Sequence, residues 1–345
     1  MKSRVLAAVL ILLIAGCSPV DDSVAIRNVT LIDALHGVRE NQTVVFQGDE
    51  ILAVHPADTA DEAATVIDGT GKFLIPGLWD FHVHLTYDPR LTEAMPELFL
   101  SWGITSVRDT GALLANILPV VERMRAEGAV APRVFFAGPL LDGQFVVYNG
   151  DGRPEIGVQV ASPEDARNMV RALYDAGVDF IKVYEMVTPE VFYALVEAAG
   201  ALGLPIDSHV PLSMRASVAG PFVDSIEHLR NIEMDCVSDG VESLLIRRQA
   251  LANRDNMPGA ALRSSLHNLQ RLSSVAAYDQ LRCDETIAAM ADTTMVPTLR
   301  LNSFNLTPSY LNDDWEQALS RLPQDVRDEL AEQGIDRAQS PSGPT

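Results

Sequence analysis

The pattern of apolar and polar residues changes near residue 75. Between residues 24 and 75, short β-branched runs such as Val24–Asp33 and Thr43–Gln47 alternate with clusters of Gly, Asp and Asn. The runs have the length of strands and the clusters supply turns, which is typical of a small antiparallel sheet. We therefore expect a small N-terminal β-sandwich domain over residues 24–75.

From Leu78 onward, strand-length apolar runs alternate with helical patterns that have N-terminal signals, such as Ser162-Pro163 and Thr188-Pro189. This alternation favours βα units around a parallel sheet. Over residues 76–345 we predict an α/β fold, a TIM-like (β/α) barrel in which seven of the eight strands are evident. These strands lie in LWDFHVHL, ITSVRD, RVFFAG, DFIKVYE, PIDSHV, DSIEHL and TMVPTL.

Two histidines stand two residues apart in the first of these strands. Side chains at positions i and i+2 of a strand point to the same face, so His82 and His84 are directed the same way. Two imidazoles buried without polar partners would cost a few kcal/mol. A metal ion removes this cost by accepting a lone pair from each ring, and imidazole is the commonest metal ligand. The pair therefore predicts a metal site.

Three further ionisable residues fall at the ends of later strands: Lys182 in DFIKVYE, His209 in PIDSHV and His228 in DSIEHL. Taken singly, they have ordinary explanations as a surface lysine, a loop histidine and a histidine near a helix end. Together with His82 and His84 they would meet at the C-terminal edge of a parallel sheet, where such barrels carry their functional groups.

The order of these motifs resembles the amidohydrolase superfamily, more closely its imidazolonepropionase-like and prolidase-like branch. The resemblance rests on PGLWDFHVHL, GITSVRD, DFIKVYE, DSHVP and SIEHL. It implies that His82 and His84 bind the more buried metal ion and that His209 and His228 bind a second. It also implies that Lys182 carries CO2 as a carbamate that bridges both ions. A ligand set of nitrogen and oxygen atoms favours zinc as the metal.

The same resemblance implies a hydrolase of carbon–nitrogen bonds in small amides, such as dipeptides or N-acyl amino acids. A hydroxide shared by the metal ions would attack the carbonyl, and a general base would pass its proton to the leaving nitrogen. In the family this base is an Asp in a Gly-Thr-Asp sequence at the end of strand eight. No Gly-Thr-Asp follows Val296, and Asp292 and Asp313 lie outside such a strand. The alternative is a non-catalytic or truncated metal-binding lipoprotein.

Three residues are candidates for binding a substrate. Arg108 ends the second barrel strand beside Asp109, where a structural ion pair is an equally common arrangement. Tyr148 and Arg153 lie in the glycine-rich loop DGQFVVYNGDGRP at the expected active face, where they would meet a substrate carboxylate. A loop that is ordered but does not contact the substrate is the preferred interpretation of this segment, and contact through Tyr148 or Arg153 is the alternative.

Other features of the mature chain bear on its structure and partners. The long segment 229–293 is expected to form a lid, with His267 on a helix surface. Cys236 and Cys283 lack metal-ligand spacing, so we predict free thiols, with a disulfide as the alternative in an oxidising compartment. The net charge of −21 argues against a nucleic-acid partner, which would require clustered Lys and Arg.

The first residues have the features of a bacterial lipoprotein signal. Lys2 and Arg4 precede an apolar run over residues 5–15, which is shorter than the roughly 20 residues that span a bilayer. The run leads into Leu-Ile-Ala-Gly-Cys, which resembles a lipobox ending at Cys17. We predict a signal peptide over residues 1–17, a linker over 18–23 and lipid anchoring on the periplasmic side of the membrane. An ordinary signal peptide is the alternative.

Replacing Cys17 tests this anchor. Cys17→Ser should move the protein from the membrane pellet to the soluble or unprocessed fraction, because the acyl chains that hold it are lost. The matched control Ser18→Ala should stay in the pellet. Fractionation followed by immunoblotting measures both variants, and a Cys17→Ser protein that fractionates like the parent would contradict the lipid anchor.

Overall fold

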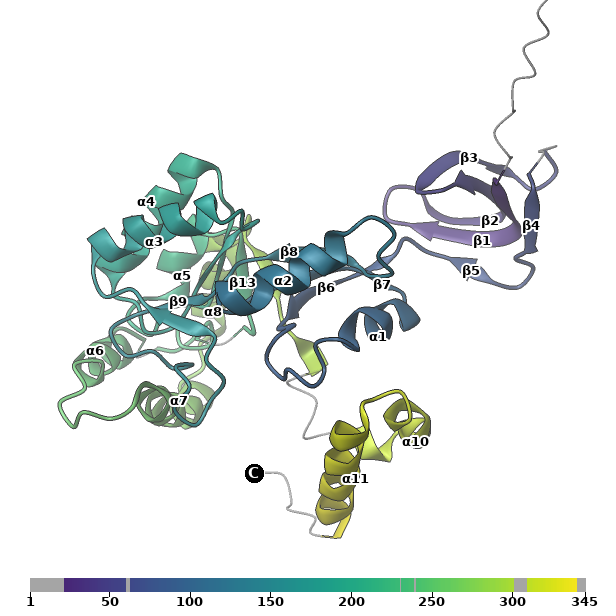
Figure 1. Cartoon of the computed structure of the whole chain (residues 1–345). Helices are drawn as coiled ribbons and strands as arrows, with labels where there is room; N and C mark the ends of the chain where they lie inside the picture. The colour runs from purple at the N-terminus through teal and green to yellow at the C-terminus, as the bar shows by residue number, and fades with distance from the viewer. Residues whose placement is uncertain (1–21, 60–62, 230, 239, 301–308, 340–345) are drawn as a thin grey trace, which may run out of the picture. The chain divides into compact units, whose positions relative to one another are not determined.

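The computed structural model describes residues 22–339 apart from 60–62, 230, 239 and 301–308 (Figure 1). The predicted signal peptide and Cys17 lie outside the described residues. The chain divides into two compact units, Met1–Pro76 and Gly77–Thr345, which are described separately. Across the described ranges, we find no helix with the length and apolar character needed to cross a bilayer.

The first unit is one five-stranded sheet. Its strands are β1 (Val24–Asp33), β2 (Gly37–Gln47), β3 (Glu50–Pro56), β4 (Thr65–Asp68) and β5 (Phe73–Leu74). The first three strands pair antiparallel, as predicted, whereas β4 and β5 run parallel to β1. Both short strands pair with this one long neighbour, β4 near its start and β5 near its end. A single mixed sheet therefore replaces the predicted sandwich of two sheets.

The second unit is built on parallel strands, and each of the seven strands predicted from the sequence is present. Two additional strands, β9 and β10, flank the glycine-rich loop. The strands are β6 (Leu78–Val83), β7 (Ile104–Asp109), β8 (Arg133–Phe136), β9 (Leu140–Asp142), β10 (Gly157–Gln159), β11 (Ile181–Val183), β12 (Ile206–Ser208), β13 (Ser225–Glu227) and β14 (Thr294–Val296).

These strands form two sheets that follow one another along the chain. One has the order β6-β7-β8 and the other the order β10-β9-β11-β12-β13-β14. Because only residues 137–139 separate β8 from β9, one extended segment leaves the first sheet and enters the second. Among the described strands, β6 pairs only with β7 and β14 only with β13, so each has an unpaired edge.

Helices follow most of these strands and bury apolar side chains against them. In α3 (Pro163–Asp175) and α4 (Pro189–Leu202), the predicted caps are present, because Ser162 and Thr188 accept hydrogen bonds from backbone N–H groups of the first turn. These two helices lie side by side (Figure 1). Other helices of this unit are α1 (Met95–Ser101), α2 (Leu114–Arg125), α5 (Ala216–Ala219), η1 (Gly220–Phe222), η2 (Ser309–Leu311), α10 (Trp315–Leu319) and α11 (Gln324–Gln339).

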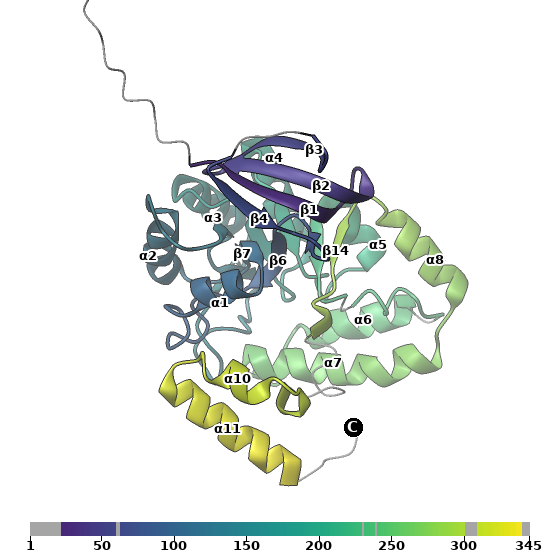
Figure 2. The same cartoon turned by 90° about the vertical axis from the view of Figure 1, so that its right-hand side faces the viewer.

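The segment predicted as a lid forms three helices between β13 and β14. They are α6 (Gly240–Ala250), α7 (Gly259–Ala276) and α8 (Gln280–Ala289), of which α6 and α7 lie side by side (Figure 2). Leu262 and Leu266 of α7 are buried in an apolar cluster with Leu140, Tyr184 and Leu212. This packing holds α7 against the strands that carry the candidate site.

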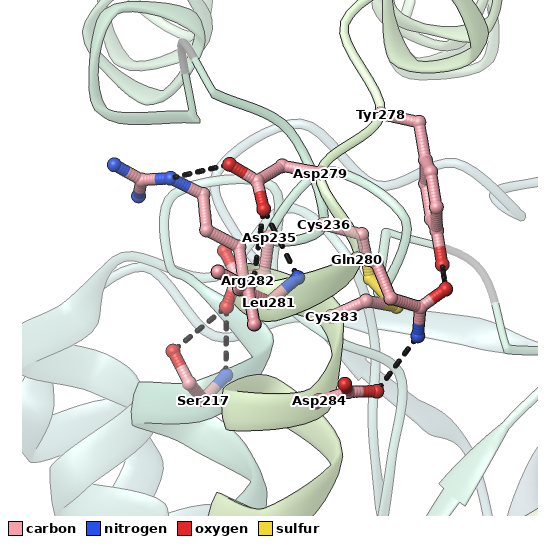
Figure 3. Close-up of a disulfide and its surroundings, with 10 residues drawn as sticks. All are labelled: Ser217, Asp235, Cys236, Tyr278, Asp279, Gln280, Leu281, Arg282, Cys283 and Asp284. Carbon is pink, nitrogen blue, oxygen red and sulfur yellow. Dashed lines mark hydrogen bonds and ion pairs between the residues drawn. A yellow bond between two sulfur atoms is a disulfide. The ribbon is translucent and has the colours of Figure 1, made fainter.

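Cys236 and Cys283 form a disulfide, which corrects the expectation of two free thiols (Figure 3). The bond joins the segment after β13 to α8 and encloses α6 and α7. Beside it, Asp235 accepts hydrogen bonds from Ser217, and Asp279 caps α8 (Figure 3). The two cysteines are 47 residues apart, so their proximity is a product of the fold that their spacing did not indicate.

Removing the disulfide should destabilise the second unit. For a loop of 47 residues, the chain-entropy model gives a loss of about 4 kcal/mol when Cys236→Ser and Cys283→Ser are combined. Urea denaturation with and without reductant measures this. Reductant should lower the parent's free energy of unfolding to that of the double variant, and it should leave the double variant's free energy of unfolding unchanged. A parent that denatures identically under both conditions and reacts with two equivalents of thiol reagent would contradict the bond.

Candidate metal centre

The four strands β6, β11, β12 and β13 bring ionisable side chains to one cavity of about 650 Å³. Lys182 lies within β11, and each histidine lies at or just beyond the C-terminal end of its strand. β11, β12 and β13 are parallel neighbours in one sheet, so their C-terminal ends lie at one edge, and β6 of the other sheet brings His82 and His84 to the same cavity. The lining residues predicted as metal ligands are His82, His84, Lys182, His209 and His228.

The four imidazole rings are close together. The ring centroids of His82 and His84 are 5.2 Å apart, those of His82 and His228 4.4 Å, and those of His209 and His228 4.8 Å. Among the described residues, no three His, Cys, Asp or Glu side chains already have the arrangement of a complete metal site.

Two buried carboxylates orient two of the rings. His82 Nδ1 donates to Glu227 Oε2, and His209 Nδ1 donates to Glu185 Oε1 over 2.8 Å. Because an ionised carboxylate only accepts hydrogen bonds, both histidines carry their proton on Nδ1, and Nε2 presents its lone pair. Histidines that bind metals are usually held in this way by an oxygen acceptor behind the ring.

Backbone and hydroxyl oxygens orient the other two rings. His84 Nδ1 donates to the Gly111 carbonyl over 3.0 Å, and His228 Nδ1 lies 2.7 Å from Thr298 Oγ1. A Cβ atom at residue 111 would lie 2.7 Å from Leu140 and 3.1 Å from His84, so glycine allows this close approach. His228 itself has a φ of 64°, a left-handed conformation in which the chain turns directly after β13.

Burial keeps these histidines neutral at physiological pH. It lowers the pKa of His84 and of His209 to about 4, and it lowers the pKa of His82 further below the ordinary value. The positive charge of Lys182 acts in the same direction on all three. Neutral imidazole is the form that binds metal ions, so the environment of the rings suits the predicted role.

Lys182 is completely buried and its Nζ donates to Asp207 Oδ2 over 3.0 Å. Burial raises the pKa of Asp207, and the charge of Lys182 opposes that rise. Asp207 also accepts from the Ser225 hydroxyl over 3.0 Å. An ammonium group has no lone pair for a metal ion, so Lys182 in this form is the partner of a buried acid and not a ligand.

Arg108 does not line the cavity. Its guanidinium donates to Glu227 Oε1 over 2.9 Å, lies 3.4 Å from Asp207 and stacks over the rings of Phe81 and Phe180. Of the two roles that the sequence left open, this arrangement matches the structural ion pair, with Glu227 and Asp207 as the partners. Arg108 thereby neutralises the carboxylate that orients a histidine.

Tyr148 and Arg153 line the cavity on the side of the glycine-rich loop. The Tyr148 ring packs between Tyr87 and Tyr184, with centroid distances of 6.3 and 5.8 Å. Arg153 lies 5.1 Å from the centre of the Tyr148 ring and donates to its hydroxyl over 3.3 Å. This wall is aromatic and cationic. The other charged side chains at the cavity wall are Asp80, Arg263 and Arg300.

Sequence reasoning missed the residues that support the site. Glu227 ends β13 and Glu185 lies two residues beyond β11, and an acid at the end of an apolar strand is the sequence signal for a buried carboxylate. His267 was expected on a helix surface, but it donates to Glu185 over 2.6 Å. Asp292 and Asp313, considered as bases, are exposed and do not line the cavity.

Removing the Arg108 charge should destabilise the second unit strongly. Arg108→Met leaves Glu227 and Asp207 without their shared cation, and breaking a buried pair costs about 3–5 kcal/mol. Arg123→Met, which removes an exposed partner of Glu93, should change little. Urea denaturation compares the two variants. Equally small changes in the free energy of unfolding would show that Arg108 does not stabilise the buried carboxylates Glu227 and Asp207.

Sequence comparison finds relatives over part of the chain only, and no family model matches. The adenine deaminase of Desulforamulus reducens is 30% identical over 103 residues, which cover 30% of this chain and 17% of the relative. That of Serratia proteamaculans is 36% identical over 95 residues, covering 28% of this chain and 16% of the relative. The matched part of the chain thus spans far less than two thirds of these relatives.

Solved structures share the fold over more of the chain. An Xaa-Pro dipeptidase matches 91% of this chain and 74% of its own, at 20% identity and a TM-score of 0.57. Molinate hydrolase matches 66% of this chain and 62% of its own, at 22% identity and a TM-score of 0.55. At these identities the likeness concerns the fold alone. Sequence relatives and fold neighbours together indicate the amidohydrolase superfamily for this chain.

Proposed function

We propose that this chain is a metal-dependent hydrolase acting on carbon–nitrogen bonds of small substrates. The observation that carries the proposal is the gathering of His82, His84, Lys182, His209 and His228 around one cavity. Amidohydrolases generally use divalent metal ions, and neutral imidazoles suit zinc. When bound, such ions supply a Lewis acid and lower the pKa of water.

In this proposal Lys182 is modified by CO2. Carbamylation would replace the ammonium with an anion bearing two oxygens, which can serve two cations. The new negative charge would lie beside Asp207, to which Lys182 now donates. Like charges at this distance disfavour one another, so the carbamate requires nearby cations to persist. Carbamylation and metal binding should therefore depend on each other.

We also propose that the two parallel sheets are parts of one incomplete TIM-like barrel. With β8 and β9 taken as one continuous position, the strands follow in the order β6, β7, β8/β9, β11, β12, β13 and β14. An eighth strand between β14 and β6 would complete it. A second cavity of about 340 Å³ supports this, since both strands line it, through Trp79, Phe81, Met295 and Val296 among others.

The cavity wall favours a substrate with a carboxylate. Arg153 supplies positive charge beside Tyr148, which suits dipeptides and N-acyl amino acids, whereas Arg263 is paired with Glu185. A second candidate is deamination of a purine. The two relatives described above are named adenine deaminases, and the aromatic wall formed by Tyr87, Tyr148 and Tyr184 would also pack against a base.

A non-catalytic metal-binding lipoprotein is the alternative from another class, because the residues given after Val296 contain no Gly-Thr-Asp. Asp80 is the one carboxylate among the described cavity-lining residues. We further propose lipid anchoring through Cys17 and a periplasm-facing location. The Cys236–Cys283 disulfide supports that location, because disulfides persist in oxidising compartments.

Metal analysis tests the centre directly. Folded protein dialysed against zinc-containing and then zinc-free buffer should retain one or two divalent ions. Combining His82→Ala with His84→Ala should reduce this content, because two nitrogen ligands are lost. His55→Ala, in the first unit, is the matched control and should retain the parent's content. A double variant with the same metal content as the parent would overturn the assignment.

Activity should be low in the chain as it stands. A positioned general base contributes about 10²–10⁴-fold in rate, so a version extended by a strand that carries Gly-Thr-Asp should be faster by that order. Both proteins, expressed with zinc and bicarbonate, are assayed against dipeptides, N-acyl amino acids and adenine. Comparable turnover by the two proteins would contradict the prediction that this chain lacks a positioned general base. Asp80→Asn would then test whether Asp80 is that base. Release of ammonia from adenine alone would favour deamination.

A further inference from the structure

Glu185 lies two residues beyond the end of β11 and is completely buried. It accepts four hydrogen bonds from three side chains. Oε1 accepts from His209 Nδ1 over 2.8 Å and from Arg263 Nη2 over 3.0 Å. Oε2 accepts from Arg263 Nε over 3.0 Å and from His267 Nε2 over 2.6 Å. Arg263 can only donate, and an ionised carboxylate paired with it accepts from both imidazoles as well.

Two of these partners come from one face of α7. Arg263 and His267 are four residues apart, which places them together on a helix. The neighbouring Leu262 and Leu266 have the same spacing and are buried in the apolar cluster under the helix. Burial of these leucines therefore sets the position of α7, and the position of α7 brings the guanidinium and the imidazole to Glu185.

The charge of Glu185 depends on this contact. An unpaired buried carboxylate would be unfavourable, and Arg263 offsets this with two N–H donors, each 3.0 Å from one carboxylate oxygen. A permanent carboxylate fixes the proton of His209 on Nδ1. The Nε2 lone pair of His209 is then the one available to a metal ion.

We propose that Glu185 is the positioning residue for His209, and that Arg263 and His267 lock Glu185 in place, so that α7 is part of the metal centre. The inference rests on the proposed function, in which His209 is a ligand. His82 has a separate support, because its carboxylate partner Glu227 is held by Arg108 from β7. Disturbing the α7 contact should therefore lower the affinity for the ion bound by His209 and leave the affinity for the ion bound by His82 unchanged.

The experiment measures zinc affinity of the full mature chain by competition with a chromophoric chelator. Loss of a buried partner behind a metal-binding histidine typically costs 10–100-fold in affinity. We expect a loss of about this size in the weaker of two sites for His267→Ala and for Glu185→Gln. His267→Gln, whose amide can still donate to Glu185, should recover much of the loss. Asn268→Ala, at the exposed neighbouring position on α7, is the matched control.

Folding is checked by the thermal midpoint of each metal-free variant. His267 is 21% exposed, so its variants should keep the parent's midpoint within a few degrees. The double variant Glu185→Gln with Arg263→Met removes the acid and its cation together, which avoids an unpaired buried charge if Glu185→Gln alone does not fold. It should show the same loss at one site.

Each remaining outcome is decisive. Unchanged affinity in all variants would overturn the positioning role while the metal centre stands. Equal losses at both sites would also overturn it, because α7 would then support the whole cavity and not His209. A parent chain that binds no zinc would overturn the proposed function, and this inference with it.

Discussion

An isolated charge buried in a protein costs several kcal/mol unless a partner offsets it. Several ionisable side chains are buried on the parallel strands of the second unit, and each has such a partner. Lys182, Asp207 and Glu227 are each at most 1% exposed. They are paired in a continuous series: Lys182 donates to Asp207, Arg108 lies between Asp207 and Glu227, and Glu227 accepts from His82. The direction of a histidine facing the cavity thus depends on a cation that never reaches that cavity.

The opposite side of the cavity is supported from outside the sheets. Glu185 has no strand cation comparable to Arg108 and is held instead by α7, a helix of the segment between β13 and β14. The disulfide encloses that segment. Glu227 and Glu185 therefore each orient a histidine, but Glu227 is held by a strand residue and Glu185 by α7. The two halves of the site should respond differently to changes in the segment between β13 and β14.

Local patterns predicted much of this arrangement. The two-residue spacing in β6 and the apolar runs of the later strands were enough to predict that the histidines and Lys182 meet at strand ends, because strand periodicity is local and the alternation of strands with helices indicates parallel pairing. The contact between His267 and Glu185 joins positions 82 residues apart, and the cysteines are 47 apart. Contacts of that range depend on how helices pack, which no short pattern encodes.

The small β unit shows the same limit. Its strand-length runs were recognisable, but the parallel direction of β4 and β5 depends on how the connecting segments bring both strands to the edge of β1 opposite β2. Arg108 is a further case. Its position at the end of β7 was evident, whereas the choice between a substrate and an internal acid required the positions of Glu227 and Asp207 on neighbouring strands.

The central claim is that these buried networks hold the imidazoles for a metal ion. Anomalous diffraction at the zinc edge, from crystals of the mature chain grown with zinc and bicarbonate, tests it most directly. The account predicts a peak about 2.0–2.1 Å from Nε2 of His82 and His84, with a second beside His209 and His228 when Lys182 is carbamylated. Zinc peaks confined to the protein surface, with the four rings ordered and no density between them, would contradict it.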